Sequence, residues 1–164
     1  MKKKQRIILF AVLTLVLALA GCGDKNTVKI AGVKTTRDAT SLDLRRAELS
    51  QKDLETLASL QNLEELDLYR SNITDLTPLA GLKNLTILEL TAESAKDVTP
   101  LLGMTKLEDL SLCGEEENLD ELAVLTNLKK LTFYSHGVVD NDAVEKVQAA
   151  IPGLVVDYPG QWGV

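Results

Sequence analysis

The sequence predicts an α/β repeat fold, in which each repeat contributes one short strand followed by a helical or 3-10 turn. The first observation is a series of five strand-like triplets, four of them Leu-x-Leu and the last Leu-x-Phe, at offsets of 24, 22, 22 and 21 residues. The second is a spacing of three between apolar residues after several of these triplets, which is typical of helical turns. The third is composition, since 31 of the 164 residues are Leu and six are aromatic. Near-identical layers that stack on one another need such uniform, aliphatic side chains.

The first residues of the chain predict a signal peptide. Lys2, Lys3, Lys4 and Arg6 form a basic start, and the stretch from Ile7 to Ala20 is apolar apart from Thr14. As a helix, these fourteen residues would span about 21 Å, which is shorter than the roughly 30 Å hydrocarbon core of a bilayer. We therefore interpret residues 1–21 as a signal peptide and not as a transmembrane helix.

The segment Leu19-Ala20-Gly21-Cys22 resembles a bacterial lipobox. The resemblance implies attachment of diacylglyceryl to the Cys22 thiol, cleavage before Cys22 and acylation of the new N-terminus. Lipid chains such as palmitate would then anchor the protein on the extracytoplasmic side of a cell membrane. Residues 22–27 would be a short tether. The mature chain would carry 14 basic and 24 acidic residues, a net charge of −10. This charge disfavours binding to nucleic acid and to an anionic bilayer surface.

The repeats extend over most of the remaining chain. Their strand segments are Leu42-Asp43-Leu44, Leu66-Asp67-Leu68, Leu88-Glu89-Leu90, Leu110-Ser111-Leu112 and Leu131-Thr132-Phe133. A further Leu stands three positions before each of the last four, and "TDLTPLAGLKNL" from Thr74 matches "KDVTPLLGMTKL" from Lys96. The phase is kept over five successive strands, which is a specific signal for a solenoid.

These residues resemble the leucine-rich repeat family, in particular its internalin-like class of 22-residue repeats, over about residues 42–156. The resemblance implies a curved solenoid with a parallel sheet on the concave face and short helices or 3-10 turns on the convex face, in one domain of about five repeats over residues 28–164. The position that the family usually gives to Asn holds Ala47, Ser71, Glu93 and Glu115 here. Ser71 would partly replace the amide. Ala95 and Glu117 stand where the second repeat has Ile73, which predicts a shallow core edge.

The two ends depart from the repeat pattern, as the ends of a solenoid must. Val28–Ile30 and Thr35–Thr36 around Ala31-Gly32 predict a hairpin that caps the first repeat. At the other end, Asp140 or Asn141 is expected to start a helix that runs through Ala150. A last strand, Leu154–Tyr158, follows, and we interpret Trp162 as a lid on the last repeat.

The outward residues of the strands form columns on the concave face, which is the usual ligand surface of the family. Asp43, Asp67 and Glu89 are expected to stack at about 4.8 Å, a spacing at which like charges repel unless they are solvated or matched by a cation. Two interpretations stay open: a solvated acidic face that keeps the protein soluble, or a docking surface for a basic protein segment with two tyrosine anchors. The candidate contact residues are Asp43, Arg45, Glu65, Asp67, Tyr69, Glu89, Asp109 and Tyr134.

The sequence argues against catalysis, cofactors and a metal site. Cys113 and His136 fall on neighbouring strands near Glu115, but such a trio would lie open to water without an oxyanion donor. A calcium site is disfavoured because no EF-hand-like loop is present. We therefore expect a lipid-anchored extracytoplasmic protein-binding module. The alternative is a structural or spacer lipoprotein of the cell envelope without a dedicated ligand.

Overall fold

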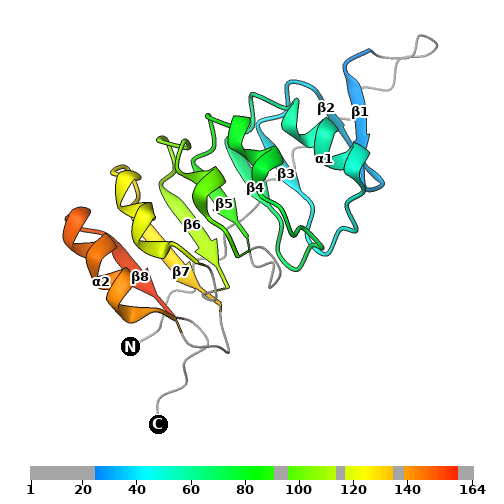
Figure 1. The fold of residues 1–164 in the computed structure, drawn as a ribbon. Helices are drawn as coiled ribbons and strands as arrows, with labels where there is room; N and C mark the ends of the chain where they lie inside the picture. Colours follow the sequence, from blue (N-terminus) through cyan, green and yellow to red (C-terminus); the bar gives the residue numbers. More distant parts are fainter. Residues whose placement is uncertain (1–24, 91–95, 114–116, 135–138, 159–164) are drawn as a thin grey trace, which may run out of the picture.

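The protein is described from a computed structural model that covers residues 25–90, 96–113, 117–134 and 139–158. Its main sheet has six parallel strands in sequence order. The strands are β3 (Ser41–Asp43), β4 (Glu65–Asp67), β5 (Ile87–Glu89), β6 (Asp109–Leu112), β7 (Lys130–Phe133) and β8 (Val155–Asp157). Figure 1 shows them as one layer, with the helices and 3-10 turns as a second layer. This arrangement confirms the predicted fold class.

The connections between strands supply the second layer. They contain the helices α1 (Gln51–Ala58) and α2 (Asn141–Ala150) and the 3-10 helices η1 (Thr77–Gly81), η2 (Thr99–Leu101) and η3 (Leu119–Val124). The α-helices occur where the repeat is longest, 24 residues from Leu42 to Leu66 and 25 from Leu131 to Val156. An α-helix rises about 1.5 Å per residue and a 3-10 helix about 2.0 Å, so an α-helix needs more residues to cover the same distance.

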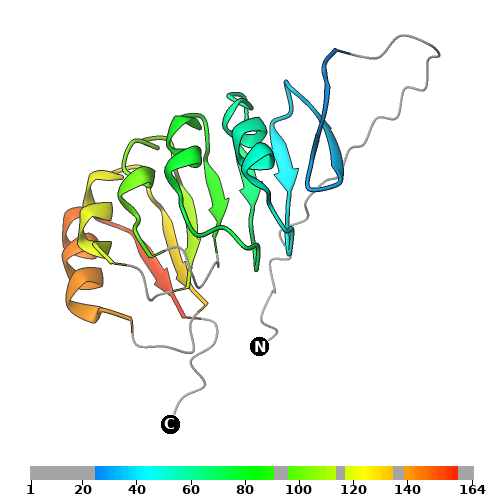
Figure 2. The same ribbon diagram turned by 45° about the vertical axis from the view of Figure 1, so that its right-hand side comes forward.

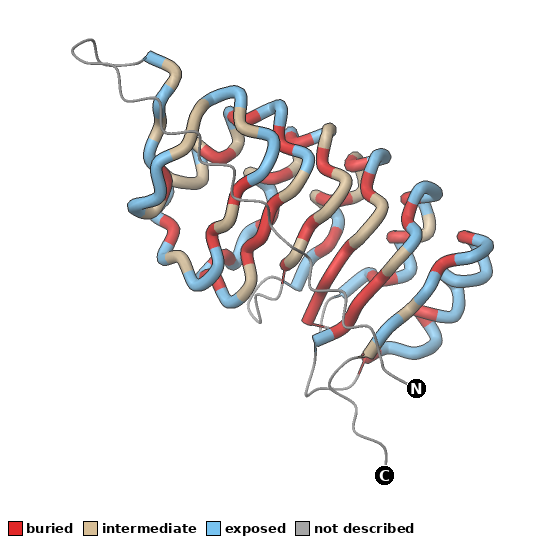
Figure 3. The backbone as a smooth tube through the Cα atoms, turned by 180° about the vertical axis from the view of Figure 1, so that it is seen from behind, coloured by how far each residue is buried: buried red, intermediate tan, exposed pale blue. Residues whose placement is uncertain are grey.

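The core lies between the two layers and is built from aligned leucines. Leu66, Leu88 and Leu110 pair with one another across β4, β5 and β6, and each is fully buried. Figure 3 shows the buried residues recurring from repeat to repeat along the tube. Glu117 is exposed, as expected for a charged residue at the edge of the core. Ala95, which was expected at the same edge, lies outside the described residues.

The prediction that Ser71 replaces the usual amide of the turns is wrong. The Ser71 side chain is buried, and its hydroxyl has no hydrogen-bond partner in the described part of the chain. The neighbouring Asn72 performs this role: Leu49 N donates to Asn72 Oδ1 at 2.7 Å, and Asn72 Nδ2 donates to Leu49 O at 3.4 Å. A carboxamide carries both a donor and an acceptor, so one side chain satisfies both groups of the preceding turn.

The solenoid has a different element at each end (Figure 2). At one end, β1 (Thr27–Ile30) and β2 (Val33–Thr36) form an antiparallel hairpin, whose residue Ala31 donates its N–H to Asp53 Oδ1 on α1 at 2.7 Å. At the other end, Tyr158 stacks on Phe133 with ring centroids 5.6 Å apart. Trp162, the residue expected to cover this end, lies outside the described residues. Within the described ranges, no helix has the length and apolarity that a membrane span requires.

Candidate functional site

The strand register places the predicted acidic residues side by side on the concave face, which is the side of β3–β8 turned away from the core. Asp43 pairs with Asp67 and Asp67 with Glu89, while Ile87 lies between Glu65 and Asp109. Adjacent parallel strands lie about 4.8 Å apart, so these carboxyl groups are close neighbours. The expected stack is therefore present.

Asp43 and Asp67 have a structural role in this stack. Each ends a strand, and each accepts a hydrogen bond from the backbone N–H two residues ahead, that of Arg45 at 3.0 Å and that of Tyr69 at 2.8 Å. Short acidic side chains commonly stabilise a turn in this way. The two aspartates are thus explained by the local backbone.

Arg45 is the internal counter-ion of these two aspartates. Its Nη2 lies 2.6 Å from Asp43 Oδ2 and its Nε lies 3.3 Å from Asp67 Oδ2. The hydrogen bond from Arg45 holds the pKa of Asp43 below its ordinary value. Burial raises the pKa of Asp67, and the charge of Arg45 only partly offsets this rise. Arg45, a candidate partner contact, lies against both aspartates while 51% of its side chain stays exposed.

Glu89 and Asp109 are different, because neither side chain makes a hydrogen bond or an ion pair with any described residue. Both are half-buried, Glu89 on β5 and Asp109 on β6. Burial is the main cause that raises the pKa of each, and the charges of Asp67 and Asp109 raise the pKa of Glu89 further. The charge of Lys130, on the strand next to β6, partly offsets the rise at Asp109, and the charges of Arg45 and Lys130 partly offset the rise at Glu89. These two carboxylates are costly to ionise and would gain from an added cation.

The two predicted aromatic anchors contact each other. Tyr69 follows β4 and Tyr134 follows β7, three strand spacings or about 14 Å away in a flat sheet. Their ring centroids are nevertheless 6.4 Å apart in an edge-to-face arrangement with an interplanar angle of 77°. The rings therefore lean toward each other along the edge of the concave face. Tyr134 remains 43% exposed and can contact a partner.

Cys113 lies in the same column as these tyrosines and is buried, with 7% of its surface exposed. The expectation that it would lie open to water is therefore wrong. Cys113 directly follows β6, which lies between the strands that precede Tyr69 and Tyr134. His136 and Glu115, the other members of the trio considered for catalysis, lie outside the described residues. No cluster that could hold a metal ion occurs in the ranges that the structure describes.

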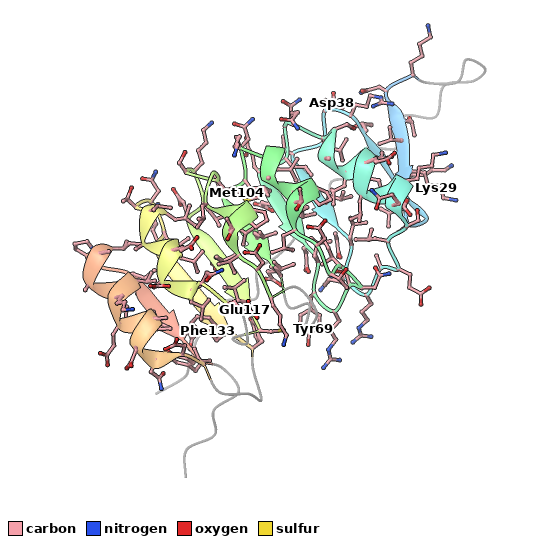
Figure 4. The ribbon with its side chains drawn as sticks, viewed as in Figure 1. Lys29, Asp38, Tyr69, Met104, Glu117 and Phe133 are labelled. Atoms are coloured by element: carbon pink, nitrogen blue, oxygen red, sulfur yellow. The ribbon has the colours of Figure 1, made fainter. Side chains whose placement is uncertain are left out.

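A basic rim borders the first strands of the concave face. It consists of Arg45, Arg46 and Arg70, and the Arg70 guanidinium lies 5.2 Å from the centre of the Tyr69 ring. Arg46 and Arg70 occupy equivalent positions of successive repeats and both have a positive φ, 58° and 55°. A shallow pocket of about 360 Å³ opens beside the rim, lined by Asp43, Arg45, Arg46 and Tyr69. The arginines thus gather beside the first two strands, near Tyr69 (labelled in Figure 4), whereas Glu89 and Asp109 lie on the middle strands.

The raised pKa values of Glu89 and Asp109 predict how stability depends on pH. An acid whose folded pKa exceeds its unfolded value, ordinarily 4.5 for Glu and 3.8 for Asp, is more easily ionised in the unfolded chain. The contribution of such a carboxyl group to the free energy of unfolding is therefore fully present below its unfolded pKa, where the group is protonated. This contribution is lost as the pH rises through the folded pKa. We expect the advantage of the Glu89→Gln/Asp109→Asn variant over wild type to be absent at acid pH and to grow above about pH 4.

Urea unfolding at a series of pH values measures this difference. The control is Asp75→Asn, since hydrogen bonds from Thr77 hold the pKa of Asp75 below its ordinary value. Its contribution is present above the unfolded pKa and is lost as the pH falls through the folded pKa, so this variant should be less stable than wild type at neutral pH. If the free energies of unfolding of Glu89→Gln/Asp109→Asn and wild type changed with pH in the same way, the prediction would be contradicted. The two concave carboxyls would then be fully solvated.

Comparisons with known proteins address the fold. No protein-family model and no curated protein matches the sequence. Among solved structures, an internalin of Listeria monocytogenes aligns with 77% of this chain at a TM-score of 0.56 and 26% identity. A leucine-rich repeat protein of Leptospira interrogans aligns with 74% of it at a TM-score of 0.52 and 19% identity. The chain has a leucine-rich repeat fold.

A third structure, internalin C2 of Listeria monocytogenes, aligns with 66% of this chain at 33% identity and a TM-score of 0.49. This leucine-rich repeat chain aligns with less than half of each of these proteins. It covers 48% of internalin C2 and 37% of each of the other two. The likeness therefore concerns the repeat architecture and not whole proteins.

Proposed function

We propose that the concave face of this leucine-rich repeat protein binds a basic segment of another protein, and that lipid on Cys22 anchors the protein on the extracytoplasmic side of a cell membrane. The observation that carries the binding proposal is the pair Glu89 and Asp109. These carboxyl groups are half-buried on neighbouring strands and make no hydrogen bond or ion pair within the described part of the chain. Their ionised forms are costly to the free protein.

A lysine or arginine of the partner would remove this cost. An opposite charge within about 4–6 Å favours the ionised form of a buried carboxyl group, so binding and ionisation support each other. Glu65, which pairs with Ile87 across β4 and β5, adds a third carboxylate. In the described part of the chain, its side chain accepts one long hydrogen bond, from Ser41 Oγ at 3.4 Å. Charge complementarity of this kind provides specificity and rapid association.

The dimensions of the concave face suit one peptide segment. Six strands span about 24 Å at 4.8 Å per spacing, which corresponds to about seven extended residues. Tyr134 would supply an aromatic contact at the edge, as aromatic side chains often do in interfaces. Asp43, Asp67 and Arg45 are left out of the proposed contact set, because the two carboxylates accept backbone hydrogen bonds in turns and Arg45 lies against both of them.

The proposal is for binding and not for catalysis. Cys113 is buried on the sheet, which removes the exposed thiolate that a thiol enzyme requires. The leucine-rich repeat fold supports a protein-interaction role, but a fold alone does not identify a ligand.

Cross-linking in living cells tests the binding proposal. A photo-reactive amino acid at Ile87 would lie among Glu65, Glu89 and Asp109, and the same group at Val124, 55% exposed on η3, serves as a control on the other layer. We expect a cross-linked protein with a basic segment from position 87 that is absent from position 124. Equal or no cross-linking from both positions would favour the alternative of a spacer lipoprotein without a ligand.

The membrane anchor rests on the lipobox resemblance of residues 19–22, which lie outside the described residues. We expect wild-type protein to incorporate a palmitate analogue in cells and to remain with the membrane fraction. Cys22→Ala should incorporate none, because it lacks the thiol that accepts lipid, whereas Cys113→Ala should label like wild type. Absence of label from the wild-type protein would contradict the anchor.

A further inference from the structure

The N-terminal hairpin carries a charge opposite to that of the rest of the protein. Residues 25–38 contain four basic side chains and one acidic side chain, a net charge of +3, whereas residues 39–164 contain ten basic and 22 acidic side chains, a net charge of −12. The basic residues of the hairpin are all exposed: Lys25, Lys29, Lys34 and Arg37. The overall negative charge therefore conceals a local positive surface.

The strand register places two of these cations on one face of the hairpin. Lys29 of β1 is directly opposite Lys34 of β2, so the two side chains share a face. The other face carries Ile30, which is fully buried in the core. Figure 4 shows Lys29 at the end of the molecule, beyond α1. The face with the lysines, which we call the outer hairpin face, thus turns away from the solenoid.

The hairpin offers little internal compensation for this charge. Like charges directly opposite each other in a sheet are unfavourable. The acidic residue of the segment, Asp38, accepts a hydrogen bond from Asn26 Nδ2 at 2.8 Å, and bonding from Thr36 and Asn26 lowers its pKa. The nearest acidic residue of α1, Asp53, accepts the backbone N–H of Ala31 and the groups of its own cap. Neither lysine of the opposed pair has a carboxylate partner among the described residues.

We infer that the outer hairpin face docks on the anionic headgroups of a lipid bilayer. This inference rests on the proposed anchoring at Cys22. Lys25 is three residues from Cys22, a distance of at most about 10 Å along an extended chain. The screening length in physiological salt is about 8 Å, so the four cations of the hairpin act on the bilayer more strongly than the acidic repeats farther along the solenoid.

The same charge distribution determines the orientation of the docked protein. The hairpin is attracted to the membrane, and the repeats, at −12, are repelled from it. The solenoid would then stand away from the bilayer with its hairpin end down. In this orientation the concave face opens sideways and stays accessible to a partner.

The experiment uses the full chain reconstituted into vesicles of phosphatidylcholine, with or without phosphatidylglycerol. A fluorescent amino acid at Thr27, an exposed position on the outer hairpin face, reports contact with a quencher on the lipid headgroups. A second probe at Gln148, exposed on α2, reports the far end. We expect quenching at Thr27 that requires phosphatidylglycerol and weakens in high salt, and little quenching at Gln148.

The decisive variant is Lys29→Glu/Lys34→Glu. Each cation near the surface favours docking about fivefold, so this reversal should lower the ratio of docked to undocked protein by more than about tenfold. Lys83→Glu/Lys96→Glu makes the same change in net charge at exposed positions of the repeats and should have a small effect. Equal quenching in both kinds of vesicle, or equal effects of the two variants, would overturn the inference. The mass of the N-terminal peptide shows whether Cys22 carries lipid. A protein that lacks the anchor is therefore distinguished from an anchored protein whose hairpin does not dock.

Discussion

Replacing Leu88 by alanine is expected to lower the free energy of unfolding by about 3 kcal/mol. Leu88 is fully buried in β5, between Leu66 and Leu110 of the adjacent strands. The backbone ladders of the parallel sheet set the spacing of these layers, so neighbouring leucines have little freedom to move into the cavity. Urea unfolding followed by circular dichroism measures the change.

The control for this prediction is Val124→Ala on η3. Val124 is 55% exposed, and its truncation should change the free energy of unfolding by less than about 0.5 kcal/mol. If Leu88→Ala cost no more than Val124→Ala, the continuous core of stacked leucines would be refuted.

Reversing the charges of Glu89 and Asp109 is expected to weaken binding of the basic partner by about a hundredfold. In Glu89→Lys/Asp109→Lys, two attractive contacts are replaced by two repulsive ones at neighbouring positions of the concave face. The measurement is the dissociation constant for the protein captured by cross-linking from Ile87. Unfolding in urea establishes that the variant is folded.

A matched reversal on the other layer separates this effect from net charge. Glu55 on α1 and Glu121 on η3 are exposed and lie on the convex side, so Glu55→Lys/Glu121→Lys makes the same change away from the site. We expect it to weaken binding by less than about threefold, by screened long-range attraction alone. A similar loss in both variants would mean that the concave carboxylates make no direct contact.

The period of the sequence was sufficient to predict the strands and their register. Aligning the Leu-x-Leu pairs placed Asp67 beside Glu89 and Ile87 beside Asp109, and the structure has these pairs. The reason is physical: in a repeat fold each strand bonds to the next at one fixed offset, so a periodic pattern determines long-range contacts. Local signals identified the helix near the C-terminus as well, since Asp140 accepts the N–H of Ala143 as a cap.

Contacts that depend on side-chain direction were not predictable from the period. The outward position of Arg45 did not indicate that its side chain turns toward Asp43 and Asp67. Tyr69 and Tyr134 follow strands that are three spacings apart, and only the orientation of the side chains brings the two rings together. A helical or 3-10 turn was expected after each strand, but the capping box of Ser50 and Asp53, which predicts where α1 begins, was not used.

The averaged charge of the chain also concealed two features. A net charge of −10 for the mature protein argued against contact with an anionic bilayer, whereas the described hairpin is basic. The acidic column of the concave face likewise contains two kinds of carboxylate. Asp43 and Asp67 stabilise turns, and Glu89 does not. Charge becomes informative about function only after the residues with structural roles are set aside.

The most direct test of the binding proposal is a paired measurement on Glu89→Gln/Asp109→Asn. At pH 7, removal of these partly compensated charges should raise the free energy of unfolding by a few tenths to about 1 kcal/mol. The same change should lower the affinity for the basic partner by about tenfold. Stability and binding are thus predicted to change in opposite directions. Unchanged values of both, as expected for a solvated acidic surface, would contradict the proposal that the concave face is a binding site.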